Sequence, residues 1–406
     1  IKNIQVVNGL GYSSPSNSIS SQSLKERLVE SAEYGLGGKP DLWHIHNHSL
    51  GKNPALTNAV ALLAEEGYPI LLQPHDFAED GRPSNFNALA EVYSITYPAS
   101  PLIHYATLNH RDFLFVDKLF KGKSTQVHLL ANSISSPPSN DLKKKSSVHL
   151  PENLFVYPVR AVRRKNLGEL ALIASVHPEK HFANSLGPTN PNFFDIFEKW
   201  KKFVQRFKLP VSFAIGEKTN VTFHDIMNHA EGIISTSIAE GFGLGFLEPW
   251  MFEKFLSGRN IPEITKDFSN LGINLDNLYN RIDIDTHHLT SRKFLKSKIN
   301  SVLVKYFSDY GKKLPVHATE IAYKSMVNEK GVDFGRLDET CQEEIISSVL
   351  KSKTSKELIQ KQINLQEIDS KLIQKNKQAV LKNFSQKAYN HKLNSIYNLL
   401  LNSKYE

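Results

Sequence analysis

The chain has 406 residues, of which 40% are hydrophobic and 22% charged, as in folded globular proteins rather than disordered or fibrous ones. Its single cysteine, Cys341, excludes an internal disulfide, and its apolar runs fall short of the roughly 20 residues that span a bilayer. The formal net charge of +8 favours anionic partners, such as nucleotide phosphates or acidic lipid headgroups.

Length, charge and cysteine content set further expectations. A chain of this length exceeds one ordinary core, so we expect two domains of roughly 150–200 residues. The basic residues do not interleave with aromatic residues in one stripe, which argues against nucleic acid. The lone cysteine fits a reducing compartment, so we expect a cytoplasmic protein, with a peripheral contact to the inner face of the membrane left open. Lysines that merely keep helix faces solvated explain the charge equally well.

In the first third of the chain, short apolar segments and a segment of helical periodicity follow each other as strands and helices do in a parallel α/β sheet. Strands are predicted at 42–46 and 70–74, with a helix over 54–66 between them. Two further strands are predicted at 103–108 and 126–131. This strand–helix–strand order predicts a parallel α/β domain.

Polar side chains gather where these strands are predicted to end. His75 directly follows the second strand, so we expect it at the carboxyl edge of the sheet, as a substrate contact or as a structural histidine. His44, His46 and His48 alternate along the first strand and are expected to share one face. A metal site there, completed by the acids between 76 and 80, ranks below a polar loop, because ligands in line on one strand surround an ion poorly.

The loop over 46–53 is predicted to face the ligand. Its candidates for acceptor binding are Asn47, His48, Lys52 and Asn53. Since Asn53 immediately precedes the predicted helix, this stretch predicts an anion contact and a plain helix cap with equal weight.

A stretch rich in Ser, Pro and Lys over 133–147 predicts a linker, and we place the domain boundary near its end. A second series follows, with predicted strands at 154–159, 211–215 and 233–237 and predicted helices at 167–175 and 224–229. Beyond about residue 351 the strand signals stop and amphipathic helices are predicted. The sequence therefore predicts two doubly wound α/β domains that face each other across a cleft, with ligands at the carboxyl ends of the strands.

Four cations follow the first predicted strand of the second domain. They are Arg160, Arg163, Arg164 and Lys165. Arginine offers a planar fork and lysine a point charge, so this cluster predicts a clamp for a diphosphate, the alternative being a solvated basic loop.

The stretch from Glu240 to Glu248 places two carboxylates eight positions apart, with alternating glycines in the first half of the gap. A predicted strand before it and a predicted helix over 244–255 make it a glycine-rich turn at a helix N-terminus, which suits a phosphate. The two acids are expected to accept hydrogen bonds from sugar and ribose hydroxyls. The loop over 259–263 is predicted either to close over a nucleotide or to form a simple turn.

Together these motifs resemble the retaining GT-B glycosyltransferases (glycosyl transferases group 1, family 4-like), which include bacterial mannosyl- and glucosyltransferases and sucrose synthase-like enzymes. The resemblance covers about 41–272 and, in outline, the C-terminal helices. It implies a Rossmann-like acceptor domain over 1–145, a nucleotide-sugar-binding Rossmann-like domain over 146–350, and C-terminal helices over 351–406. The last of these helices is expected to pack back on the first domain.

The resemblance also implies roles for the residues that match the family's motifs. The expected catalytic residues are His75, which contacts the transferred sugar, Glu240, and the basic pair Arg160 and Lys165, which neutralises the diphosphate. The expected donor-binding residues are the basic pair, Gly241, Phe242, Gly243 and Leu244 along the main chain, and Glu248, which holds the ribose.

Three features depart from the family's pattern. Val159 stands where a glycine usually precedes the basic pair, and Pro249 falls inside the predicted helix, which we expect it to kink. Too few residues precede the histidine-rich strand for the usual number of strands. We therefore expect an N-terminal piece to be missing, and with it a loop that contacts the diphosphate.

The predicted activity is that of a hexosyltransferase that moves a sugar from a nucleotide-diphosphate sugar to an acceptor hydroxyl with retention of anomeric configuration. The departing phosphate is expected to take the acceptor's proton. No cofactor and no metal is expected, because protein cations neutralise the leaving group. Two alternatives stay open on the same fold: a sugar phosphorylase or nucleotide-sugar epimerase, and a non-catalytic nucleotide-sugar-binding protein.

Overall fold

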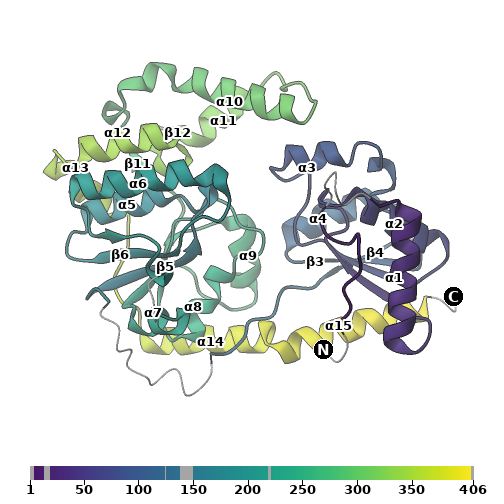
Figure 1. The fold of residues 1–406 in the computed structure, drawn as a ribbon. Helices are drawn as coiled ribbons and strands as arrows, with labels where there is room; N and C mark the ends of the chain where they lie inside the picture. The colour runs from purple at the N-terminus through teal and green to yellow at the C-terminus, as the bar shows by residue number, and fades with distance from the viewer. Residues whose placement is uncertain (1–3, 13–18, 124, 138–149, 218–220, 404–406) are drawn as a thin grey trace. The chain divides into compact units, whose positions relative to one another are not determined.

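The computed structural model describes residues 4–12, 19–123, 125–137, 150–217 and 221–403, which fold into two compact units (Figure 1). Unit 1 takes its residues from 1–133, 304–314 and 386–406, and unit 2 takes its residues from 134–303 and 315–385. The predicted boundary between residues 145 and 146 lies outside the described residues, and the chain first passes from unit 1 to unit 2 between Ser133 and Ile134.

Within its described residues, unit 1 is built on a parallel sheet of four strands in the order β1-β2-β3-β4. The strands are β1 (Trp43–His46), β2 (Ile70–Gln73), β3 (Ile103–Thr107) and β4 (Gln126–Leu129). The helices of unit 1 are α1 (Ser21–Leu36), α2 (Pro54–Glu65), α3 (Pro83–Ala88), α4 (His110–Phe120) and α15 (Gln386–Asn402), with a 3-10 turn η1 (Tyr93–Ile95).

Strand β2 shows how the core of unit 1 is divided. Ile70 and Leu72 pack in one cluster with apolar residues of α2 and α4, whereas Leu71 between them packs with Ile396 and Leu400 of α15. Because successive side chains of a strand point to opposite faces, helices cover both faces of this sheet. The C-terminal helix α15 is therefore part of unit 1.

Over the described part of unit 2, six parallel strands form a sheet in the order β10-β9-β8-β5-β6-β7. The strands are β5 (Leu154–Arg160), β6 (His181–Leu186), β7 (Val211–Ser212), β8 (Gly232–Ser235), β9 (Leu256–Arg259) and β10 (Leu278–Tyr279). The helices that follow them are α5 (Leu167–Val176), α6 (Phe194–Phe207), α7 (Phe223–His229), α8 (Glu248–Met251) and α9 (Pro262–Asn270). Figure 1 shows α5 and α6 over one face of the sheet and α7 and α8 over the other, which is a doubly wound arrangement.

A second, smaller sheet with its helices completes unit 2. Its strands pair antiparallel in the order β11-β13-β12 and are β11 (Asp283–Ile284), β12 (Val327–Asn328) and β13 (Gly331–Asp333). The helices after β11 are α10 (Leu295–Asp309), α11 (Ala318–Met326), α12 (Glu339–Val349), α13 (Lys353–Gln360) and α14 (Ser370–Phe384). The residues of α10 from 304 onward belong to unit 1. The 3-10 turns of the second half are η2 (Arg163–Lys165), η3 (Pro191–Phe193), η4 (Ile215–Glu217), η5 (Leu244–Phe246), η6 (Thr286–His288), η7 (Thr290–Phe294) and η8 (Phe334–Arg336).

Two predicted elements differ from the structure. The strand expected over 211–215 is shorter, since β7 ends at Ser212 and η4 begins at Ile215. The helix expected over 244–255 is wrong: the 3-10 turn η5 and the four-residue helix α8 stand in its place. No helix in the described part of the chain combines the length and apolar character needed to cross a bilayer.

Candidate functional site

The strand order of unit 2 contains one point where the direction of winding reverses. From the adjacent strands β5 and β8, the chain continues outward through β6 and β7 on one side and through β9 and β10 on the other. In open α/β sheets, ligands bind outside the carboxyl ends of the strands at such a reversal. The two loops that leave this point run over 161–166 and 236–243, and they carry the basic cluster and the first predicted acid.

Direct hydrogen bonds hold these two loops together. The Ile238 N–H donates to the carbonyl of Arg164 over 2.9 Å. The hydroxyl of the buried Thr236 donates to the carbonyl of Lys165 over 2.9 Å and to that of Asn166 over 3.2 Å. The main chain around Lys165 is therefore fixed against the loop that carries Glu240.

The side chains of Lys165 and Glu240 form an ion pair, and only 13% and 12% of their surfaces are exposed. The Ser237 hydroxyl also donates to Glu240 Oε1 over 2.5 Å, so the hydroxyl of Tyr157, 2.5 Å from Ser237 Oγ, donates to Ser237. Burial lowers the pKa of Lys165, and the carboxylate of Glu240 opposes this shift. The predicted cation and the predicted acid thus meet in a partly desolvated site.

Arg160 lies at the end of β5 and is exposed. Its Nη1 donates to the carbonyl of Gly187 over 3.0 Å, and the N–H of Gly187 in turn donates to Glu217 over 2.7 Å. Gly187 follows β6, a strand that sequence reasoning missed because its buried Asn184 and Ser185 interrupt the apolar pattern. The Gly-Pro pair after β6 is the signal that marks the end of that strand.

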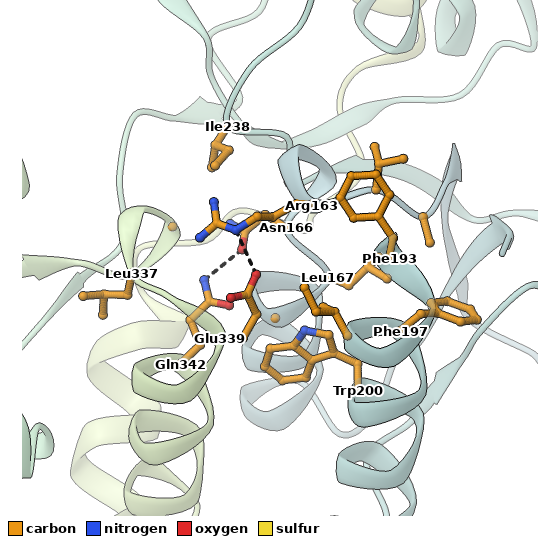
Figure 2. Close-up of a pocket in the computed structure, with 15 residues that line it drawn as sticks. Arg163, Asn166, Leu167, Phe193, Phe197, Trp200, Ile238, Leu337, Glu339 and Gln342 are labelled. Atoms are coloured by element: carbon orange, nitrogen blue, oxygen red, sulfur yellow. Dashed lines mark hydrogen bonds and ion pairs between the residues drawn. The ribbon is translucent and has the colours of Figure 1, made fainter. Parts of the chain in front are cut away.

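Arg163 has an acidic partner outside these two loops. Its Nε pairs with Glu339 of α12 over 3.1 Å, at the mouth of a pocket whose walls include Phe193, Phe197 and Trp200 (Figure 2). Of the four predicted cations, Arg163 is therefore already paired with Glu339, which leaves Arg160, Arg164 and Lys165 as candidates for the diphosphate clamp.

The second acid, Glu248, is half-buried on α8, and burial raises its pKa. Pro249 follows it in the first turn of α8, where a proline removes no intrahelical hydrogen bond, so the predicted kink is wrong. Because η5 and α8 are so short, the predicted stabilisation of a phosphate by a long helix dipole does not apply.

The glycine-rich turn itself separates into core and surface. The Phe242 side chain is buried and its ring lies 5.6 Å from that of Phe268, so Phe242 can offer only its main chain to a donor. Leu244 is exposed, and Gly241 lies between the buried Phe242 and Glu240. Gly243 has φ +91°, and a Cβ there would lie 2.9 Å from the Phe246 ring, so this turn requires glycine.

In unit 1, His75 and His46 contact each other at the carboxyl ends of β2 and β1. The distance from His75 Nε2 to His46 Nδ1 is 2.8 Å, and the His75 N–H donates to Asn47 Oδ1 over 2.8 Å. Burial lowers the pKa of His75, and burial together with the neighbouring His44 and His75 lowers the pKa of His46 to about 4. Both rings are therefore neutral near pH 7, one donating and the other accepting.

Two of the remaining acceptor candidates, His48 and Asn53, do not face a ligand as predicted. His48 is 1% exposed and its Nε2 donates to the Thr96 carbonyl over 2.9 Å, so it does not line a cleft. It also does not share the face of His44 and His46, because β1 ends at His46. Asn53 caps α2 and donates to two carbonyls of the 9–11 segment over 2.8 Å, which makes it the plain cap.

Lys52 keeps its place as an exposed cation, with Nζ 5.1 Å from the centre of the Tyr12 ring. Among the described residues, no group of three or more His, Cys, Asp or Glu side chains is arranged to hold a metal ion.

Of the two alternatives predicted for 259–263, the structure fits the simple turn, because β9 ends at Arg259 and α9 begins at Pro262. Arg259 ends β9 and is 4% exposed, and its guanidinium pairs with Glu169 over 2.6 Å and with Asp333 over 2.9 Å. The Tyr279 hydroxyl donates to Glu169 over 2.8 Å. Nothing in the sequence pairs these residues, which come from β9, α5, β13 and β10, so only the fold reveals this buried ion cluster.

Comparisons with known proteins agree with this architecture. No family model matches the sequence. Over 249 residues the chain is 30% identical to the mannosylglucosyl-3-phosphoglycerate synthase of Petrotoga mobilis, a match that covers 57% of the chain and 48% of that protein. The chain thus spans about half the length of this curated relative.

Solved structures confirm the fold. The sucrose-phosphate synthase of Thermosynechococcus elongatus is similar at TM-score 0.52 and 13% identity, over 96% of this chain and 82% of the other. Anabaena HepE in complex with UDP and glucose is similar at TM-score 0.51 and 11% identity, over 93% of this chain and 81% of the other. The predicted GT-B fold is therefore confirmed, and the sequence is similar to that of one glycosyltransferase.

Proposed function

We propose that this chain transfers a hexosyl group from a nucleotide-diphosphate sugar to an acceptor hydroxyl, with retention of anomeric configuration. The observation that carries the proposal is the meeting of Lys165 and Glu240 at the winding reversal of unit 2. The GT-B fold and the identity to a curated glycosyltransferase support it.

In the proposed reaction, the bond from the anomeric carbon to the diphosphate oxygen breaks and a bond to the acceptor oxygen forms. The acceptor's proton passes to the departing diphosphate. Arg160 and Lys165 stabilise the negative charge that develops on the leaving group. Preorganised groups in a partly buried site lower the free energy of the transition state by roughly several kcal/mol. These protein cations supply the neutralisation, so we propose that no metal is required.

Donor binding has to rearrange the Lys165–Glu240 pair. In this pair each charge satisfies the other. A bound donor offers the lysine a diphosphate and offers the carboxylate hydrogen bonds from sugar hydroxyls. Both groups therefore exchange one partner for another and keep their hydrogen bonds. Ser237 and Tyr157 remain behind Glu240 and keep its carboxylate in place.

In unit 1, we propose that His75 contacts the transferred sugar, the role that the family resemblance implies. Its neutral ring, linked to His46, offers a hydrogen bond rather than a charge. A contact with a membrane surface remains a prediction from the net charge alone.

The relatives suggest which ligands to try first. Solved complexes of Anabaena HepE hold UDP and UDP-glucose, and the name of the Petrotoga relative contains mannose, glucose and 3-phosphoglycerate. The experiment is a thermal-shift panel of UDP-, GDP- and ADP-sugars, followed by transfer assays with a phosphoglycerate glucoside and with neutral sugars.

Stabilisation by one donor, transfer of its sugar with retained configuration seen by NMR, and unchanged transfer in excess chelator are expected. A requirement for inorganic phosphate would favour a phosphorylase instead. Tight donor binding without product over hours would favour a binding protein.

A further inference from the structure

The segment of unit 2 that carries the small sheet and α12, residues 283–303 and 315–349, is called here the small-sheet segment. It has no part in the chemistry proposed above, yet one of its side chains reaches the loop that carries Lys165. Gln342 lies on α12 and is 2% exposed. Its Nε2 donates to Asn166 Oδ1 over 2.8 Å (Figure 2). The same Nε2 also donates to the Phe334 carbonyl over 3.2 Å. The partner, Asn166, directly follows Lys165.

Asn166 adopts a left-handed backbone conformation and is held in it by several hydrogen bonds. Its φ is +52°, in a region that asparagine enters more readily than most residues with a side chain, and glycine more readily still. Both polar atoms of the side-chain amide are hydrogen-bonded, because Oδ1 accepts from Gln342 and Nδ2 donates to Glu169 over 3.1 Å. The carbonyl of Asn166 accepts from Thr236. These contacts hold the turn that aims the preceding lysine.

Gly168 shows that α5 is built around the Gln342 amide. A Cβ at this position would lie 2.0 Å from Gln342 Oε1 and 2.5 Å from Trp200 Cζ2. Gln342 thus fills the space beside the first turn of α5, directly after the turn at Asn166, and a residue with a side chain at position 168 would push it away.

A second link joins the small sheet to the same asparagine. Asp333 of β13 pairs with Arg259, and Arg259 pairs with Glu169, which accepts from Asn166. The small-sheet segment therefore reaches Asn166 twice, once through Gln342 and once through buried charges.

We propose that Gln342 is a positioning residue: by holding Asn166 in its left-handed turn, it places the ammonium group of Lys165 for the donor diphosphate. This inference rests on the proposed function. It assigns the small-sheet segment to the donor site, although Gln342 itself touches no reacting atom.

The experiment is a double-mutant cycle on the full chain. Gln342→Met keeps the length of the side chain and removes its donor, and Lys165→Ala removes the group that it positions. In the wild-type background, Gln342→Met is expected to lower kcat roughly ten- to a hundredfold, since a small misplacement of a catalytic group has effects of this size. It is also expected to weaken binding of the nucleoside diphosphate. In the Lys165→Ala background, it is expected to change neither quantity further.

A matched control is a glutamine after α13 that contacts strand β11 of the small sheet. Gln362 accepts from the Asp283 N–H over 2.8 Å and donates to the Asp283 carbonyl over 3.0 Å, without reaching the lysine turn. Gln362→Met is expected to keep the wild-type kcat. If Gln342→Met fails to fold, Asn166→Gly replaces it, because glycine tolerates the left-handed turn and lacks both side-chain links.

The outcomes separate the inference from the function beneath it. Equal losses caused by Gln342→Met with and without Lys165, in an enzyme whose wild type is active, overturn the positioning role alone. An equal loss in Gln362→Met does the same, because it indicates general damage to the sheet. A wild type that neither binds a nucleoside diphosphate nor transfers a sugar overturns both proposals.

Discussion

Lys165 and Glu240, 75 positions apart in the chain, neutralise each other at the carboxyl edge of a parallel sheet. Each side chain is mostly buried, so water solvates neither charge fully. This relationship decides how the site responds to a ligand and to mutation.

Glu240→Gln is expected to bind a nucleoside diphosphate more tightly than the wild type while losing most of its turnover. The variant removes the carboxylate that is paired with Lys165 and would compete with the diphosphate, but this is also the carboxylate proposed to hold the sugar. Calorimetry with UDP and GDP, beside a transfer assay, measures both effects. Glu231→Gln, which breaks the more exposed pair with Lys180, is the control and should change neither. Weaker diphosphate binding in Glu240→Gln would contradict the competition.

Lys165→Ala is expected to lower kcat about 10²–10³-fold, the usual effect of removing one group that stabilises a developing negative charge. The loss of folding stability is expected to be smaller, roughly 1–3 kcal/mol, for leaving the half-buried carboxylate of Glu240 without its cation. Denaturant unfolding and steady-state kinetics separate the two. Turnover equal to that of the wild type would remove Lys165 from the mechanism.

Glu248→Gln is expected to stabilise the fold at about pH 7 and to weaken donor binding. Burial raises the pKa of Glu248 in the folded chain, so above that pKa its charge costs stability, and the cost disappears as the pH falls below the pKa of the unfolded chain. The difference in melting temperature between variant and wild type should therefore shrink toward about pH 3. A wild type that is the more stable protein at neutral pH would contradict this sign.

Gly243→Ala and Gly245→Ala form a matched pair within one turn. Gly243 has φ +91° and a close neighbour in Phe246, whereas a Cβ on Gly245 would meet nothing within 4 Å. We expect Gly243→Ala to cost about 1–3 kcal/mol and to weaken donor binding, because the turn has to deform. Gly245→Ala should leave stability unchanged or slightly higher. Equal effects in the two variants, measured by thermal unfolding, would show that the backbone of Gly243 is not a constraint.

Local patterns in the sequence predicted the four strands of the unit 1 sheet and three strands of the large unit 2 sheet, β5, β7 and β8, but missed β6, β9, β10 and the small sheet. The periodicity over 154–159 and the glycine-rich turn after 233–237 placed the basic pair and the first acid at neighbouring strand ends. The missed strand β6 and the wrong helix over 244–255 have physical reasons. Buried Asn184 and Ser185 are satisfied by contacts that the sequence does not show, and a proline after Glu248 begins a short helix as readily as it kinks a long one.

The contacts around the site were beyond the sequence because they join residues far apart in the chain. The hydrogen bonds of Asn53 to the 9–11 segment, the burial of His48 and the pair of Arg163 with Glu339 each depend on a partner that local spacing does not identify. The same holds for Gln342, which is 176 positions from the asparagine it holds. Residue types and strand ends predicted where the candidate site residues lie. They did not predict which of these side chains already have hydrogen-bond or ion-pair partners within the protein.

The buried Arg259 has a consequence for anyone who wishes to cut or graft this protein. Its guanidinium is neutralised by one acid from the large sheet's first helix and one from the small sheet. Deleting the region beyond Tyr279 would strand Arg259 with one remaining partner, and losing a member of such a buried set costs roughly 3–5 kcal/mol. The large-sheet part of unit 2 is therefore not a detachable module that ends with its sixth strand, and shortened versions should be designed to keep Asp333.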